Sequence, residues 1–137
     1  MRERDVQDQV RLAVSKDTPM ICLRCNAGQV WAGEKRYTPE YGYVIVNPRP
    51  VKLLPEGFPD LLCLGPGADT VFLEVKNEKG KTRPSQDRFL ALMHEYGFST
   101  AVVRSAEDAV KYINDKDRRK PNGEDQLRPA AGQPGNN

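Results

Sequence analysis

Two acidic residues and one lysine in the middle of the chain have types and spacing suited to metal chemistry. Asp60 precedes one apolar run, and Glu74 and Lys76 close the next, with a Gly/Pro-rich turn between the runs. If the runs form an antiparallel hairpin that turns about Gly67, Asp60 faces Glu74 across it, with Cβ atoms about 5 Å apart. The two-residue period of a strand then puts Lys76 on the same side of the sheet.

A pair of facing carboxylates repels unless one takes a proton or a cation lies between them. Oxygen ligands without histidine or thiolate favour Mg²⁺ or Mn²⁺, and Mg²⁺ keeps waters and phosphate oxygens beside one or two carboxylates. An ammonium group beside a metal-bound water can orient or deprotonate the nucleophile and offset charge on a phosphate. These residues therefore predict cation-dependent attack on a phosphate ester. The alternative interpretation is an ordinary Asp-Glu-Lys cluster on the surface of a two-stranded ribbon.

Helices are needed to position this hairpin. Both of its arms are apolar on successive residues, as strands covered on both faces are. Helical spacing predicts a first helix near the N-terminus, a second from Pro84 to the residue before Gly97, and a third that begins after an S-x-x-D cap at Ser105. Glu3 in the first helix and Gln86 in the second fall on the buried stripes. Both side chains are expected to point towards the hairpin.

The remaining segments complete a single domain. Strands are expected at 21–24, 43–46 and 100–104, which gives the order α-β-(β)-ββ-α-β-α. Residues 29–58 carry four prolines among aromatic residues, which favours irregular hairpin-like structure over helix. From about Asp115 the sequence has almost no apolar content, so a domain at 1–114 followed by a disordered polar tail at 115–137 is predicted.

Composition bounds the function further. The net charge of +2 is too small for a protein held to nucleic acid by bulk charge. Three cysteines, no signal-peptide pattern and no apolar run of about 20 residues predict a reduced, soluble, cytoplasmic protein without a membrane span. Cys22 and Cys25 form a C-x-x-C, but only Cys63 and His94 remain to complete a zinc site, so a buried strand at 20–23 is the preferred interpretation.

The ordered set of motifs resembles the PD-(D/E)XK superfamily and, within it, the VRR-Nuc family. The resemblance covers roughly residues 1–113. It rests on Glu3 with Gln7, on Arg24-Cys25-Asn26-Ala27-Gly28, on Gly57-Phe58-Pro59-Asp60, on Glu74-Val75-Lys76, on Gly80 and on Gln86. Two departures are a longer, proline-rich stretch from Trp31 to Pro55 and Arg83 in place of a small polar helix cap.

The resemblance implies an α/β fold with a restriction endonuclease-like core, in which a central mixed sheet is flanked by helices. It implies that Mg²⁺ or Mn²⁺ is bound by Asp60, Glu74 and the backbone carbonyl of Val75, with Glu3 completing or supporting the site. Lys76 would act on the attacking water and Gln86 would orient it. Arg24 and Asn26 would approach the phosphate. Basic residues beyond the E-x-K strand could follow a phosphate backbone: Lys79, Lys81, Arg83 and Arg88.

The leading hypothesis is thus a metal-dependent endonuclease that cleaves branched DNA such as Holliday junctions, flaps or forks. A catalytically silent nucleic-acid-binding module with the same fold is the first alternative. A small phosphohydrolase acting on nucleotides is the second, although no phosphate-cradling glycine loop is visible. A homodimer is expected, because a nuclease this small often needs two copies to cut both strands symmetrically.

Overall fold

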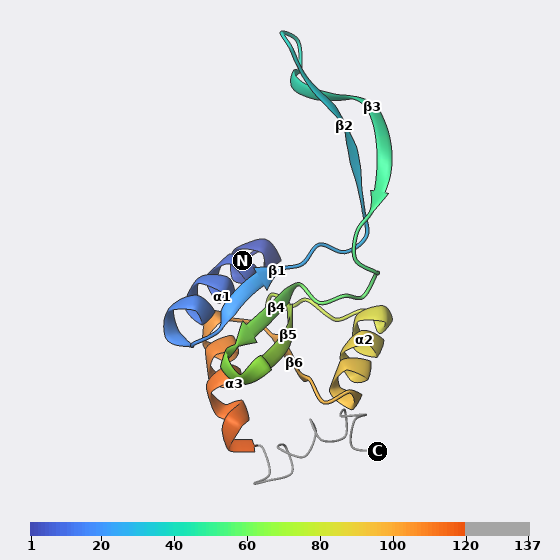
Figure 1. The fold of residues 1–137 in the computed structure, drawn as a ribbon. Coiled ribbons are helices and arrows are strands. Elements are labelled where there is room, and N and C mark those ends of the chain that lie inside the picture. Colours follow the sequence, from blue (N-terminus) through green and yellow to red (C-terminus); the bar gives the residue numbers. More distant parts are fainter. Residues whose placement is uncertain (120–137) are drawn as a thin grey trace.

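The computed structural model describes the backbone of residues 1–119 and the side chains of residues 1–116. Its helices and strands are shown in Figure 1. In chain order they are α1 (Glu3–Asp17), β1 (Ile21–Arg24), β2 (Gln29–Thr38), β3 (Gly42–Lys52), β4 (Leu61–Gly65), the 3₁₀ turn η1 (Pro66–Ala68), β5 (Asp69–Val75), α2 (Pro84–Glu95), β6 (Ser99–Val103) and α3 (Ala106–Arg119).

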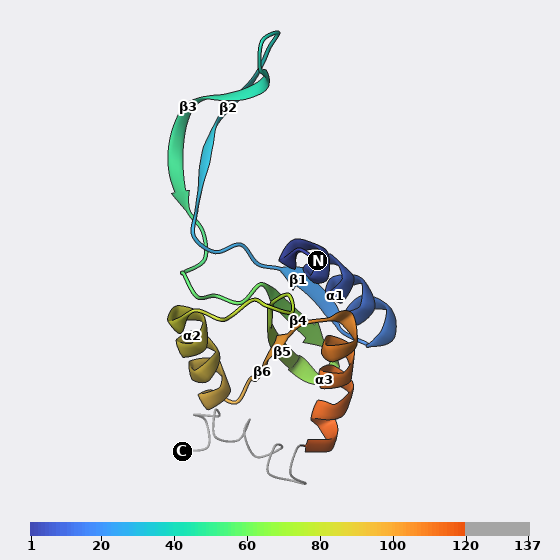
Figure 2. The same ribbon diagram turned by 180° about the vertical axis from the view of Figure 1, so that it is seen from behind.

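Four strands form the central sheet, in the order β1-β4-β5-β6. The strands β1, β4 and β5 are antiparallel neighbours, and β6 runs parallel to β5 after the crossover through α2. Helices α1 and α3 pack on one face of this sheet, and α2 lies on the opposite side of the molecule (Figures 1 and 2). The predicted α/β fold with a mixed sheet flanked by helices is confirmed.

The main core lies between α1, α3 and the sheet. Helix α1 contributes Val6, Val10 and Val14 at helical spacing, each at most 4% exposed. Strand residues from β4, β5 and β6 and two residues from α3 complete it: Leu61, Cys63, Val71, Leu73, Val75, Val103, Ala109 and Ile113. On the other face a smaller aromatic cluster joins Phe72 to Phe58, Phe89 and Phe98, with ring centroids 5.5–6.1 Å from Phe72.

The β4–β5 hairpin has the predicted register. Leu64 pairs with Thr70 and Leu62 with Phe72, and Gly67 occupies the turn at φ +71°. The ladder ends at Leu61↔Leu73, so Asp60 lies immediately before β4 rather than within it. The third helix begins as expected, because Asp108 N–H donates to Ser105 Oγ at 3.1 Å.

Residues 29–52 form a separate two-stranded sheet, here called the arm, which extends away from the core (Figures 1 and 2). The predicted hairpin is present in this segment, but the predicted irregularity is wrong: β2 and β3 pair regularly over almost their full length. One irregularity interrupts them, between Ala32 and Glu34. Prolines 48 and 50 are tolerated because each strand of a two-stranded ribbon has an outer edge that needs no ladder hydrogen bonds.

Two further expectations are corrected. Strand β1 is buried on one side only: Cys22 packs against the core, whereas Ile21 and Leu23 are 57% and 44% exposed, because they point to the other face at the edge of the sheet. Residues 115–119 of the predicted tail are helical, since α3 continues to Arg119. Lys116 Nζ lies 2.6 Å from Asp69 Oδ1. Residues 120–137 of the predicted tail lie outside the described part of the chain.

Within residues 1–119, none of the helices combines the length and the apolar character that crossing a membrane requires.

Candidate active site

The end of β5 carries the two central charged groups. Because strand residues alternate, Leu73 and Val75 enter the core under α1 and α3, while Glu74 points to the opposite face. Glu74 and Lys76 are 1% and 6% exposed. Lys76 Nζ lies 3.5 Å from Glu74 Oε1 and 3.8 Å from Glu3 Oε1. A lysine is thus buried between two carboxylates that come from different elements.

Asp60 is fixed against the same strand end by its side chain and its backbone. Val75 N–H donates to Asp60 Oδ2 at 2.9 Å, and Cys25 N–H donates to the Asp60 carbonyl at 2.8 Å. Gly57 shapes the approach, since its φ is +90° and an added Cβ would lie 2.5 Å from the Ser85 carbonyl oxygen. Only glycine combines this conformation with such close passage of the backbone.

Gln86 links α2 to the site with both ends of its amide. Its Nε2 donates to Glu74 Oε1 at 2.8 Å, and its Oε1 accepts from Arg83 N–H at 2.8 Å. The second bond caps the first turn of α2, where Arg83 occupies the N-cap and Pro84 follows. The orientation of the amide is therefore fixed by the helix terminus, which presents the NH₂ group to the buried carboxylate.

Burial and charge strongly perturb the acidity of Glu74. Its pKa is raised from 4.5 to about 8, first by desolvation and then by the neighbouring Asp60 carboxyl group, while Lys76 opposes the rise. Asp60 accepts from the backbone N–H of Val75, the residue that follows Glu74, so the two carboxyl groups lie at the same strand end. Without a cation, Glu74 keeps its proton near neutral pH.

The oxygens present suit a hard divalent cation. Glu74 Oε2 is buried and has no hydrogen-bond partner among the described residues. Among the side chains that the structure describes, no group of three or more from His, Cys, Asp or Glu is arranged to hold a metal. Asp60 and Glu74 therefore offer two carboxylates, a number with which Mg²⁺ is commonly bound when waters and substrate oxygens complete its shell. The residues fit the predicted Mg²⁺ or Mn²⁺.

Gly80 allows α1 to approach the E-x-K strand end. An added Cβ at Gly80 would lie 2.9 Å from Glu3 Oε2 and 3.3 Å from Lys76 Cδ. The side chain of Glu3 is 45% exposed, so it reaches Lys76 from the solvent side. A side chain at residue 80 would push Glu3 away from the lysine.

A cleft of about 390 Å³ opens beside these groups. Asp60 and Gln86 form part of its wall, together with Arg24, Asn26 and Arg83. Arg24 and Asn26 are exposed, and they end β1 and begin the connection to the arm. The cleft thus presents cationic and amide groups next to the carboxylate pair.

No protein-family model and no curated protein matches the chain. The chain is similar to a solved structure described as a VRR_NUC domain. The two share 23% identity, with a TM-score of 0.48, and the match covers 82% of this chain and 94% of the other.

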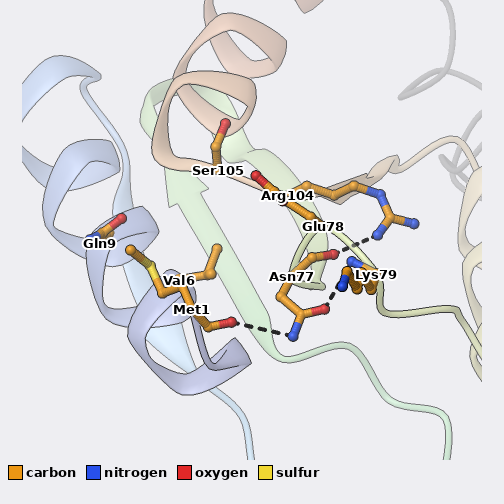
Figure 3. Close-up of a pocket in the computed structure, with 8 residues that line it drawn as sticks. All are labelled: Met1, Val6, Gln9, Asn77, Glu78, Lys79, Arg104 and Ser105. Carbon is orange, nitrogen blue, oxygen red and sulfur yellow. Dashed lines mark hydrogen bonds between the residues drawn. The ribbon is translucent and has the colours of Figure 1, made fainter.

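Most of the predicted site residues lie together, but three of the basic residues, Lys79, Lys81 and Arg88, do not line the cleft. Lys79 lines a different pocket of about 400 Å³, next to Met1 and Arg104 (Figure 3). Lys81 is exposed and lines neither pocket. The loop after β5 turns Lys79 away from the carboxylate pair, which sequence proximity to Lys76 could not reveal.

Two contributors were not predicted as site residues. Gln7 lines the cleft, and its Oε1 is buried without a partner among the described residues; its position one helical turn after Glu3 was the available signal. Arg104 Nη1 donates to the carbonyls of Asn77 and Gly80 at 2.6 and 2.7 Å, and the bond to Asn77 is drawn in Figure 3. This guanidinium fixes the loop that carries Gly80 beneath Glu3.

Proposed function

We propose that the protein is a nuclease of the VRR-Nuc type that hydrolyses DNA phosphodiester bonds with Mg²⁺ or Mn²⁺. The observation that carries the proposal is the buried Glu74, which has one unpartnered oxygen and lies beside Asp60 and Lys76. A protein has little reason to bury a carboxyl group and a lysine next to a second, half-buried carboxyl group unless the arrangement serves a ligand. Hydrolysis of a phosphate ester would use all three groups, the two carboxyl groups to bind a cation and the lysine to act on the attacking water.

Asp60 and Glu74 would hold the cation directly. Val75 N–H points to Asp60, and because the N–H and C=O groups of one strand residue face the same edge, the Val75 carbonyl is directed to that side as well. When bound, Mg²⁺ or Mn²⁺ polarises a phosphate oxygen and lowers the pKa of a coordinated water. Gln86 keeps the Glu74 carboxylate oriented through its amide.

Lys76 would orient the attacking water and offset charge that develops on the phosphate. Its ammonium is already desolvated and lies between Glu74 and Glu3, so little reorganisation is needed when substrate enters. Glu3 is then a positioning residue that acts through Lys76, as well as a supporting carboxylate. Arg24, Asn26 and Arg83 would contact the phosphates on either side of the scissile bond from the cleft wall.

We also propose a homodimer on branched DNA. Four apolar residues share one face of the paired strands β1 and β4, namely Ile21, Leu23, Leu62 and Leu64. Helix α2 does not pack on this part of the sheet. A second copy that covers this face would give the two-fold pair of sites that symmetric cleavage of a junction needs. Light scattering is expected to give a dimer mass, and Leu23→Glu a monomer mass; a monomeric parent protein would remove this part of the proposal.

The central test is cleavage by the purified protein. A four-way junction, a flap and the matching linear duplex are incubated with Mg²⁺, with Mn²⁺ or with EDTA. We expect divalent-dependent cleavage of the branched substrates, reduced at least about 10³-fold in Asp60→Ala and Lys76→Ala. Glu95→Ala is the matched control, because Glu95 is an exposed acidic residue at the far end of α2.

Two results would contradict the proposal. Cleavage that survives in both variants would exclude the site. Tight binding of branched DNA without strand scission in either cation would instead identify a catalytically silent module.

A further inference from the structure

The arm exposes an unusual concentration of aromatic side chains. Trp31, Tyr37 and Tyr43 are 62%, 67% and 68% exposed, although a soluble domain normally covers side chains of this size. They lie outside both the main core and the aromatic cluster beneath α2. Nothing in the fold of residues 1–119 accounts for them.

These aromatic residues share one face of the ribbon with lysines. Strand alternation places residues 29, 31, 33, 35 and 37 of β2 on one side, and their partners include Tyr43, Ile45 and Lys52. Gly33 sits at the centre of this face, where an added Cβ would lie 2.6 Å from Ile45 Cγ2. We call the resulting surface the aromatic face; its members are Trp31, Lys35, Tyr37, Tyr43, Ile45 and Lys52.

The chemistry of the aromatic face suits an unpaired nucleic-acid strand. Lys35 and Lys52 are its charged members, and both acidic residues of the arm lie elsewhere: Glu34 points to the opposite face and Glu40 is in the turn. Tyr37 and Tyr43 meet edge to face at 5.4 Å, and Lys35 Nζ lies 4.2 Å from the Tyr43 ring centroid. Aromatic surfaces with interspersed cations bind single strands by stacking on bases and attracting phosphates.

The base of the arm, where residues 26–28 lie beside residues 53–54, adjoins the cleft. Gly28 N–H donates to the Leu54 carbonyl, and Leu53 N–H donates to the Gly28 carbonyl. Asn26, Ala27 and Gly28 on one side of the base also line the cleft beside Asp60. A nucleic-acid strand that leaves the cleft at this point meets the arm. At the rise per residue of a β-strand, Trp31 and Tyr37 lie about 20 Å apart along the arm. That length accommodates several nucleotides.

Strand addition by a second copy is disfavoured at one edge of the arm. Residues 48 and 50 of β3 are both proline and lie two apart, so their nitrogens face the same edge. Prolines that remove donors from an exposed edge prevent another strand from pairing there. The ribbon therefore offers its face rather than its β3 edge to a partner.

We propose that the aromatic face of the arm binds the unpaired strand of a branched DNA substrate, next to the duplex that is cleaved. The proposal rests on the proposed nuclease function, because it takes DNA to be the ligand of the cleft. It narrows the substrate to DNA in which a single-stranded segment adjoins the scissile phosphate. The arm is then a selectivity element that lies outside the catalytic groups.

The test uses the full chain in EDTA, so that no strand is cut. Trp31 is the single tryptophan, and its fluorescence therefore reports on the arm alone. We expect a thymidine oligonucleotide to quench this fluorescence. We expect Trp31→Ala with Tyr37→Ala to weaken binding of a fluorescent flap substrate at least about tenfold and to change binding of the blunt duplex less than about threefold. Lys35→Gln with Lys52→Gln should lower the slope of log affinity against log salt for the flap by about 1.4.

The matched control is Glu34→Ala with Arg36→Ala, which removes an exposed ion pair of 3.0 Å from the opposite face without a change in net charge. This variant should bind flap and duplex like the parent. Melting curves of all variants check that the core remains folded.

Three outcomes separate the arm from the catalytic proposal. Quenching with selective loss of flap binding supports the arm even if the protein never cleaves DNA. Unchanged flap binding in the Trp31/Tyr37 variant overturns the arm inference even if cleavage is robust. A fall from dimer to monomer in that variant, with unchanged flap affinity per protomer, overturns it and makes a second copy the occupant of the face.

Discussion

The cleft and the arm differ in how far their functional side chains are exposed to solvent. Gln86 in the cleft wall and Glu74 and Lys76 beside the cleft are at most 7% exposed, and each is held by a named partner. In the arm the ion pair between Arg36 and Glu34 is more than half exposed, and the large aromatic side chains lie in solvent.

This difference in exposure distinguishes buried groups that depend on one another from exposed groups that are available to a ligand. Charges removed from water interact strongly and must be satisfied by their neighbours, so the cleft is a rigid, coupled unit. Exposed ion pairs contribute about 1 kcal/mol or less, so residues of the arm are free to be chosen for a ligand rather than for the fold. The four experiments below test this contrast, from the largest expected effect to the smallest.

Removal of the buried ammonium should have the greatest effect. Lys76→Ala is expected to lower cleavage at least about 10³-fold, because the substrate charge and the attacking water lose the buried ammonium beside Glu74. By contrast, replacing residues 30–51 by an Asn-Gly turn between the paired Gln29 and Lys52 should keep the melting temperature within about 5 °C of the parent. If removal of the arm unfolded the core, the arm would contribute to the fold and the proposed difference between arm and cleft would be wrong.

Cation affinity should depend on pH through Glu74. Its pKa of about 8 means that a cation must displace a proton at lower pH. Between pH 6 and 8 the affinity for Mn²⁺, measured by calorimetry, is expected to rise by up to about tenfold per pH unit and then to level off. Glu74→Gln should bind Mn²⁺ weakly at every pH. A flat profile for the parent protein would mean that Glu74 is already ionised without the cation.

The same carboxyl group should make stability fall with pH when cations are absent. Between pH 4.5 and about 8 the folded chain holds a proton on Glu74 that the unfolded chain has lost, so raising the pH favours unfolding. Relative to Glu74→Gln, the parent in EDTA should lose about 3 to 4 kcal/mol of unfolding free energy from pH 5 to pH 8. Denaturant titrations of both proteins measure this difference. Parallel curves would show that the buried carboxyl group carries no such penalty.

Two glycines with positive φ give the smallest and most local comparison. Gly57 lies against Ser85 beside the cleft, whereas Gly42 in the arm turn has no atom within 4 Å of an added Cβ. Gly57→Ala should cost about 3 kcal/mol and reduce cleavage, and Gly42→Ala about 1 kcal/mol with cleavage of linear duplex unchanged. Chemical denaturation ranks the two. Equal costs would indicate that the loop before Asp60 is free to move.

Local patterns were sufficient for much of the hairpin and its flanks. A tight turn about Gly67 and the two-residue period of strands put Glu74 on the face opposite Leu73 and Val75, since each strand residue has only two directions available. Asp60 and Lys76 lie just outside β4 and β5, where Asp60 accepts from Val75 N–H and Lys76 contacts Glu74. The S-x-x-D cap at Ser105 is equally local and was read correctly. The chemical roles of these residues remain predictions until cleavage is measured.

The sequence could not predict which residues are buried by a packed helix, or which residues of distant elements they contact. Alternation indicates which way Ile21 or Lys76 points, but whether a helix lies there depends on how the whole chain packs. The bond from the Gln86 amide to Glu74 joins residues 12 apart in sequence, and the bond from Lys116 to Asp69 joins residues 47 apart. Burial is a property of the assembled fold, and burial determines the acidity of Glu74.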